Sequence, residues 1–224
     1  MSARNRSNPL ALAVLMCLCE RPMHPYEVAT TLRQRNKHES VRLNYGSLYA
    51  VVESLERRGL IEPKEIERSG RLPERTIYHI TDAGKNEVHE WLSELLSVPA
   101  KEYPAFEAAI SFLPGLPPAT VVALLEERAT RLELDIAAWW GSRELLQKRA
   151  FPRLFWVEGD YANDMKVAEL DWVRRLSQDI STGALEGLDW WQAVHEGADG
   201  TVPPPPFDLL ATEVLHSYSA EEGR

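Results

Sequence analysis

Apolar residues in the first part of the chain recur at spacings that predict three helices. The run 10–19 is apolar on nearly every side and follows Asn8 and Pro9, which favour a helix start, so we expect a central, buried helix. A second, shorter helix is expected over 26–34 and a third over 44–58. The third helix has an inward stripe at spacings i, i+3, i+4 and i+7, formed by Leu48, Val51, Val52 and Leu55.

The residues after the third helix change to strand periodicity. Segments 60–67 and 76–80 have the β-branched, aromatic and alternating character of strands, and the turn residues 69–73 join them into a hairpin. Thr81 then caps a fourth helix expected over 83–96. Three helices, a hairpin and a helix in this order predict a winged helix-turn-helix, in which the two-stranded hairpin is the wing.

Beyond Pro99 and Pro104 the pattern predicts only helices. They are expected over 106–113, 119–149, 159–180 and 188–195. The sequence therefore predicts a mainly α protein with three parts. These are a winged helix-turn-helix DNA-binding domain over 1–96, an all-helical domain for dimerisation or effector binding over 97–200, and a Pro-rich spacer and tail over 201–224.

The two long helices of the second part each carry an apolar stripe that we expect to face inward. On the first helix the stripe is Val121, Leu125, Leu132, Ile136 and Trp139. On the second it is Tyr161, Met165, Trp172, Leu176 and Ile180. Two helices cannot hide all the tryptophans of this part, so we expect a second copy of the chain to cover the remaining apolar surface in a homodimer.

The distribution of charge changes the interpretation of the net charge of −9. Residues 1–80 carry thirteen basic and nine acidic side chains, whereas residues 97–224 carry eleven basic and twenty-one acidic ones. The first part can therefore approach an anionic partner, and the acidic second part cannot.

Features of membrane-bound, exported and metal-binding proteins are not expected. The run 10–19 is too short to span a membrane, and Glu20, Arg21 and Pro22 stand where a signal peptide needs small residues, so we expect a cytoplasmic protein with no membrane partner. The two cysteines, Cys17 and Cys19, point to different faces of one helix and cannot pair.

Catalytic and cofactor-binding motifs are missing from the sequence. There is no Gly-rich phosphate loop, HExxH or GxSxG motif, and the six histidines are scattered singly. We expect no cofactor, no metal and no enzymatic activity.

Polar residues at the start of the third helix are candidates for contacting DNA. With the apolar stripe inward, the outward set is Asn44, Tyr45, Ser47 and Tyr49, with Arg42 just before it. Helix N-termini favour phosphate, and hydroxyl and amide side chains bond phosphates or base edges. At the tip of the wing, the cations for the DNA backbone or the minor groove are Arg68, Arg71 and Arg75.

Five motifs follow one another in the first part of the chain. They are Leu10–Leu18, His24–Val28, Tyr45–Tyr49, Leu55–Ile61 and Arg75–Thr81. In this order they resemble the signatures of the PadR family of bacterial regulators, and the resemblance spans roughly 8–95. It implies a winged-helix dimer that represses nearby genes and is released by a ligand or signal, with residues from 97 onward resembling the dimerisation domain of the larger members. The implied DNA contacts are Tyr26, Tyr45, Ser47, Tyr49, Arg71 and Arg75.

Two positions depart from the family pattern. Pro25 stands where the family usually has glycine before the tyrosine of the second helix, and Ala50 stands where it usually has proline. Neither departure changes the expected fold, but both mean that the base contacts of the family carry over less directly to this chain.

Two further interpretations concern a ligand and the function itself. Trp91, Trp139 and Trp172 are candidates for binding a small aromatic or hydrophobic effector, although tryptophans in helical domains more often belong to a core or an interface. The main hypothesis is a repressor that binds a palindromic operator as a homodimer. The alternative is a helical protein-interaction module whose winged helix docks on a protein partner, and the basic wing argues against it. An enzyme in the second half is a third, remote option.

Overall fold

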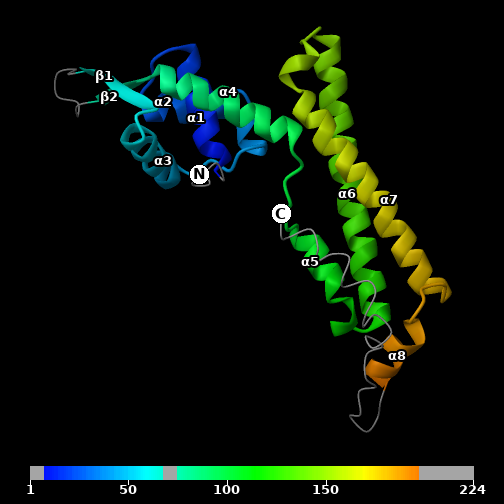
Figure 1. Cartoon of the computed structure of the whole chain (residues 1–224). Coiled ribbons are helices and arrows are strands. Elements are labelled where there is room, and N and C mark those ends of the chain that lie inside the picture. Colours follow the sequence, from blue (N-terminus) through cyan, green and yellow to red (C-terminus); the bar gives the residue numbers. More distant parts are fainter. Residues whose placement is uncertain (1–7, 68–74, 197–224) are drawn as a thin grey trace. The chain divides into compact units, whose positions relative to one another are not determined.

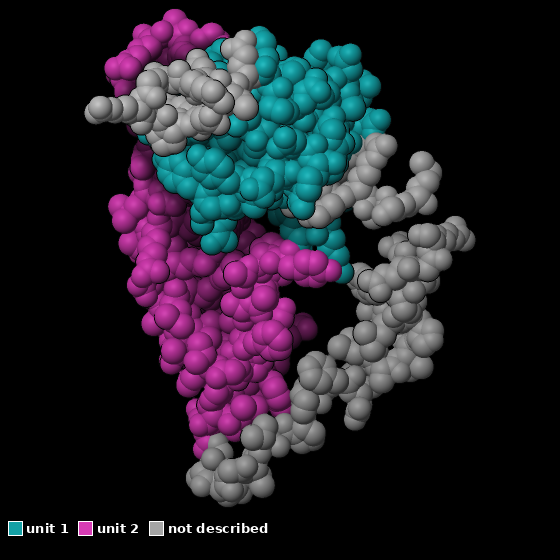
Figure 2. Space-filling view, turned by 90° about the vertical axis from the view of Figure 1, so that its left-hand side faces the viewer, with its two compact units in different colours: residues 1–102 teal, residues 103–224 magenta. Residues whose placement is uncertain are grey.

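The chain is divided into two compact units, residues 1–102 and 103–224 (Figure 1; Figure 2). The computed structural model describes residues 8–67 and 75–196. Each unit has its own apolar core, so each is described separately. The predicted tail over 201–224 lies outside the described residues.

Unit 1 has the element order of a winged helix-turn-helix, as the sequence predicted. Its elements are α1 (Pro9–Glu20), α2 (Pro25–Gln34), the 3₁₀ helix η1 (Lys37–Glu39), α3 (Tyr45–Arg57), β1 (Ile61–Glu67), β2 (Arg75–Ile80) and α4 (Asp82–Ser97). The predicted caps are confirmed, because Asn8 Oδ1 accepts from the Leu10 amide and Thr81 Oγ1 accepts from the Gly84 amide, each at 3.1 Å.

Helix α1 is the centre of the unit 1 core, as its apolar composition predicted. It contacts α2, α3, α4 and β2 (Figure 1). Its buried residues are Leu10, Ala11, Val14, Leu15, Cys17 and Leu18. The inward stripe of α3 is also confirmed, since Leu48, Val51, Val52 and Leu55 are all buried. Trp91 of α4 is only 1% exposed and closes the same core.

The wing is an antiparallel pair of strands held to the helices by a short bridge. Its register starts at Ile61 opposite Ile80 and shifts between Pro63 and Glu65. Met23 exchanges two backbone hydrogen bonds with Tyr78 of β2, each 3.0 Å long, and so fixes the base of the wing beside the start of α2. The sequence pattern did not predict this bridge, because it joins segments far apart in the chain.

Unit 2 is a helical hairpin with shorter helices attached. Its elements are α5 (Ala105–Ser111), the 3₁₀ helix η2 (Leu113–Gly115), α6 (Pro118–Lys148), the 3₁₀ helix η3 (Arg153–Phe155), α7 (Val157–Thr182) and α8 (Leu188–Glu196). Helices α6 and α7 run side by side (Figure 1). Their core joins Val121, Leu125 and Leu132 to Leu170, Val173 and Ile180. Trp191 of α8 donates its indole N–H to the Leu116 carbonyl at 2.8 Å.

The predicted inward stripe of α7 is wrong over most of its length. Tyr161 is 68% exposed, Met165 50% and Trp172 38%. The buried residues of α7 are Asp160, Asn163, Leu170, Val173, Ser177 and Ile180, and of these Ile180 alone belongs to the predicted stripe. Helix α7 therefore has two apolar faces. Periodicity identified one of them without revealing which of the two meets α6.

Polar groups and a glycine explain the packing at the end of the hairpin where η3 connects α6 to α7. The buried Asp160 carboxylate lies 2.9 Å from Arg153 Nε and 3.6 Å from Arg143 Nε, so a charge can stay on the inner face. A Cβ atom on Gly159 would lie 1.9 Å from the ring of Trp139. Trp139 of α6 therefore rests directly on the backbone of α7, which only glycine permits.

Candidate nucleic-acid interface

The first turn of α3 is built by two of the predicted DNA-contact residues. Asn44 is the N-cap, and its Oδ1 accepts a 2.9 Å hydrogen bond from the Gly46 amide. Ser47 donates its hydroxyl to the Asn44 carbonyl at 2.9 Å. Both side chains are exposed, and the Ser47 oxygen keeps acceptor capacity for an incoming donor. Positive helix-dipole charge is thus presented to solvent at this end.

Aromatic residues extend this exposed surface. Tyr45 is 37% exposed and Tyr49 is 45% exposed, whereas Leu48 between them is fully buried. The burial of Leu48 orients α3 so that both tyrosines point away from the core. Tyr26 of α2 is 58% exposed, and its ring is parallel to that of Tyr45 within 12° at a centroid distance of 6.2 Å. The structure therefore brings together Tyr26 and Tyr45, which the sequence assigned from different helices.

Gly46 lies between these side chains on the exposed first turn. A Cβ atom there would meet only Asn44 Oδ1, at the ordinary contact distance of 3.5 Å. Packing within the described residues therefore does not require glycine at this position. Its effect is to leave the backbone of α3 open to a close approach from outside.

The basic residues of the predicted interface are described only in part. Arg42 is exposed just before α3. Arg75 is the first residue of β2. Arg68 and Arg71 lie outside the described residues.

Tyr78 connects the wing to α3. Its hydroxyl donates to Glu56 Oε2 of α3 at 3.2 Å. Burial, reinforced by the Glu56 carboxylate, raises the pKa of the Tyr78 phenol above its ordinary value, so the phenol stays a proton donor. Tyr78 therefore joins β2 of the wing to α3 through this hydrogen bond.

Arg33 is part of this surface although the sequence analysis did not single it out. It donates a hydrogen bond to the Tyr45 hydroxyl, and its guanidinium carbon lies 4.5 Å from the centre of the Tyr45 ring. The available signal was its spacing of seven residues from Tyr26. Seven residues are about two helical turns, which places both residues on the same face of α2.

The three tryptophans considered for an effector do not form one site. Trp91 is buried in the core of unit 1. Within unit 2, Trp139 packs on Trp156 at a centroid distance of 6.3 Å, whereas Trp172 meets Phe106 of α5 edge to face at 6.1 Å.

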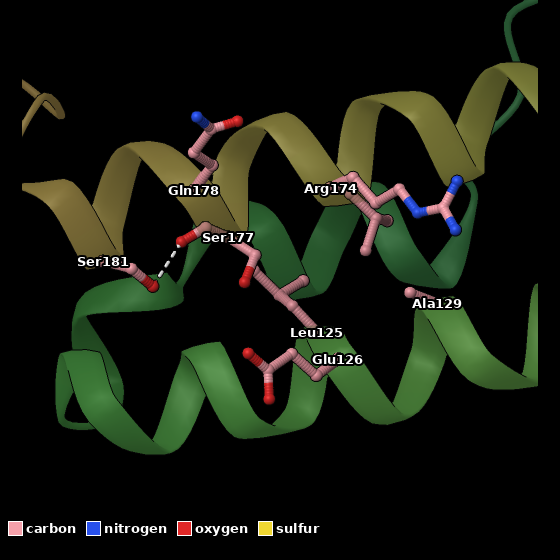
Figure 3. A pocket seen from close by; sticks show the side chains of 8 residues that line it. Leu125, Glu126, Ala129, Arg174, Ser177, Gln178 and Ser181 are labelled. Atoms are coloured by element: carbon pink, nitrogen blue, oxygen red, sulfur yellow. Dashed lines mark hydrogen bonds between the residues drawn. The ribbon is translucent and has the colours of Figure 1, made fainter.

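The described part of unit 2 contains hollows beside its long helices, of which two are considered as ligand sites. The first, of about 420 Å³, lies along α5 and α6 and has a mostly apolar lining that includes Phe106, Leu113, Leu124 and Leu132. The second, of about 300 Å³, lies along the seam of α6 and α7 and is more polar (Figure 3). There Ser181 donates its hydroxyl to the Ser177 carbonyl at 2.7 Å.

Metal and membrane signatures were also sought in the described residues. No group of histidine, cysteine, aspartate and glutamate side chains within residues 8–67 and 75–196 is arranged to hold a metal ion. None of the helices in these ranges is both long enough and apolar enough to cross a membrane.

Comparison with known proteins confirms the resemblance seen in the sequence. Residues 14–90 match the model of the transcriptional regulator PadR-like family. The structure of Bacillus subtilis PadR in complex with operator DNA is 19% identical with a TM-score of 0.61, and the match covers 77% of this chain and 99% of that one. The same protein in complex with p-coumaric acid is 18% identical with a TM-score of 0.61, covering 77% and 98%.

A third solved structure gives the same picture. The protein smu.1604c from Streptococcus mutans is 20% identical with a TM-score of 0.52, covering 74% of this chain and 96% of its own. No curated protein matches the chain. Identities this low show a common fold, and unit 1 is therefore a PadR-like winged helix-turn-helix.

Proposed function

We propose that this protein is a transcriptional repressor that binds a palindromic operator as a homodimer and is released by a small aromatic or hydrophobic effector. The observation that carries the DNA-binding part is the first turn of α3. Its inner side is sealed by Leu48, while Asn44, Tyr45, Ser47 and Tyr49 are exposed around an open glycine. The match of residues 14–90 to the PadR-like family supports the same conclusion.

The first turn of α3 is suited to the major groove. A helix fits there with its N-terminal residues toward the base edges. Tyr45, Ser47 and Tyr49 would contact bases or phosphates, while Arg42 and the helix N-terminus attract the phosphate backbone. Arg71 and Arg75 of the wing would add sequence-independent contacts to the neighbouring backbone or minor groove.

The homodimer is supported by the outer apolar face of α7. Tyr161, Met165 and Trp172 lie at spacings of four and seven residues, so they form one stripe, and all three are exposed. Contiguous apolar surface of this kind marks interaction sites, and a two-fold dimer would place two copies of α3 on successive turns of a palindrome. We therefore assign this stripe to contact with a second copy of the chain.

The effector is assigned to the hollow along α5 and α6. Its volume of about 420 Å³ falls within the usual range of about 300–1,000 Å³ for ligand pockets. Its lining is mostly apolar, and its two cations already have partners, since Arg128 pairs with Glu169 and Arg131 with Glu127. These features favour an aromatic ring over a highly charged ligand. Trp172 contacts this site through Phe106, which lines it.

DNA binding can be tested by fluorescence anisotropy. The full chain is titrated into labelled DNA from immediately upstream of its own gene and into a scrambled duplex of equal length, at two salt concentrations. If that DNA yields no binding, selection from a random duplex library supplies the operator. Specific binding should exceed binding to the scrambled duplex by about 10³-fold or more and weaken steeply with salt.

The opposite results would refute the DNA-binding proposal. Equal, weak binding to all duplexes in both experiments would leave the protein-docking module as the function. Failure of library selection to enrich any sequence would have the same meaning.

The dimer can be tested by sedimentation of variants in the exposed stripe. Met165→Glu should convert the dimer to a monomer, because it places a charge in the centre of the apolar contact. Gln178→Glu adds the same charge to an exposed position of α7 outside the stripe and should sediment like the parent chain. A Met165→Glu protein that stays dimeric would place the interface elsewhere.

The effector site can be tested with p-coumaric acid as the probe. The acid should release the operator from the parent chain but not from Ala109→Trp, which fills the hollow along α5 and α6. Ala108→Trp, on the same helix but not lining the hollow, is the matched control. Release that is undiminished in Ala109→Trp would exclude this hollow as the site, and no release from the parent chain would exclude this class of effector.

A further inference from the structure

We propose that Arg33 is a positioning residue that holds Tyr45 in the orientation used for base discrimination. The inference rests on the proposed DNA-binding function and adds to it a residue outside the reading helix. Arg33 acts on DNA sequence recognition through Tyr45, whose ring and hydroxyl it contacts.

The geometry joins three side chains from two helices. Arg33 donates to the Tyr45 hydroxyl while its guanidinium carbon sits 4.5 Å from the centre of the Tyr45 ring. On the opposite end of the same helical face, Tyr26 lies parallel to the Tyr45 ring within 12°. Tyr45 is thus restrained at its hydroxyl and along its ring by residues of α2.

Tyr45 needs such restraint because the core does not supply it. It is the first residue of α3 and is 37% exposed, so the buried stripe of the helix leaves its side-chain torsions free. A free aromatic side chain would lose rotamer entropy on binding, and holding it beforehand removes that cost. The planar guanidinium of arginine can stack on the ring and donate to the hydroxyl together, which the ammonium of lysine cannot do.

Arg33 also differs from the arginines that lie just before and just after α2. Arg35 pairs with Glu20 at 2.7 Å, and Arg21 pairs with Glu27 at 2.6 Å. Among the residues that the structure describes, no carboxylate pairs with Arg33. An aromatic ring takes the place of a counter-ion, so the positive charge remains available beside the surface assigned to DNA.

The test measures discrimination between operator variants by anisotropy. The parent chain, Arg33→Ala, Arg33→Lys, Tyr45→Ala and the double variant Arg33→Ala/Tyr45→Ala are titrated against the operator and against duplexes carrying single base changes. Arg33→Ala should lower discrimination by roughly threefold to tenfold at the base positions that Tyr45→Ala affects, and should have no further effect in the Tyr45→Ala background. Arg33→Lys should keep the salt dependence of the parent chain but should not restore discrimination.

Two controls separate positioning from folding and from net charge. Thermal unfolding midpoints should agree across the variants, because Arg33 and Tyr45 are exposed. Arg35→Ala removes the same charge at the C-cap of the same helix and should leave discrimination unchanged.

Three outcomes would overturn the inference while leaving the proposed function intact. The first is that Arg33→Ala lowers discrimination equally in the presence and in the absence of Tyr45. The second is that Arg33→Lys discriminates as well as the parent chain. The third is that Arg35→Ala loses as much discrimination as Arg33→Ala. A parent chain that discriminates among no duplexes would instead refute the proposed function itself.

Discussion

Replacing Gly46 by alanine should stabilise the protein and weaken its binding to the operator. The methyl group would meet only Asn44 Oδ1 at 3.5 Å, so the folded state has room for it. Where the native backbone suits both residues, a Gly→Ala change stabilises by about 0.4–1 kcal/mol, because the unfolded chain loses conformational freedom. For a domain of this size that corresponds to about 2–8 °C in Tm.

The same methyl group lies where α3 would approach DNA. Forcing an extra methyl group into a well-packed contact costs about 1–3 kcal/mol. That is about 5-fold to 150-fold in Kd. The two effects have opposite signs, and loss of fold therefore cannot imitate the loss of binding.

The assay pairs thermal unfolding with anisotropy on one preparation, and Gly141→Ala provides the control. Gly141 is an exposed glycine of α6, and the methyl group of an alanine there would meet no neighbouring atom within 4 Å. Alanine at this position should therefore stabilise unit 2 and leave operator affinity unchanged. If Gly46→Ala bound the operator as tightly as the parent chain, the assignment of the first turn of α3 to close DNA contact would be refuted.

Three further predictions concern stability. Gly84→Ala should lower the free energy of unfolding, measured by urea titration, by at least about 1–3 kcal/mol, because the added Cβ would lie 2.2 Å from the Leu60 carbonyl oxygen. A smaller loss would mean that α4 can shift away from Leu60. Asn44→Ala should lower the free energy of unfolding by about 0.5–2 kcal/mol through loss of the helix cap, and Asn44→Ser should retain most of that stability. Equal losses in the two variants would show that the cap is not the cause. Burial raises the pKa of Cys17 from 9.0 to about 11, so the folded state disfavours the thiolate and the free energy of unfolding should fall as pH rises from about 9 to about 11. Cys17→Ala should remove this contribution to the pH dependence of stability. An unchanged pH dependence in that variant would assign the effect to other groups.

Local signals account for what was predicted well. The order of elements in unit 1, the caps at Asn8 and Thr81 and the inward stripe of α3 depend on residues within a few positions of one another. Helix capping and amphipathic spacing act over one or two turns, so the chain expresses them before any tertiary contact forms. The exposed set Asn44, Tyr45, Ser47 and Tyr49 followed directly from knowing which side of α3 is apolar.

The face of α7 that packs on α6 could not be predicted from such local signals. The sequence offered an apolar stripe with Tyr161 and Met165, yet the helix packs on α6 through Leu170, Val173 and the paired carboxylate of Asp160. A buried carboxylate is tolerated because arginines from α6 and from η3 meet it there. Such partners are far away in the sequence, and periodicity cannot anticipate them.

By itself, the sequence determined the helices, the wing, the division into a basic and an acidic part, and the candidate reading helix of this protein. Only the tertiary structure decided that Arg33 and Tyr26 flank Tyr45, that Met23 bridges the wing, and which apolar face of α7 is left exposed. The physical reason is the range of the interactions. Backbone hydrogen bonding and side-chain spacing within one helix are encoded locally, whereas ring stacking, ion pairing and burial between elements depend on how distant segments pack.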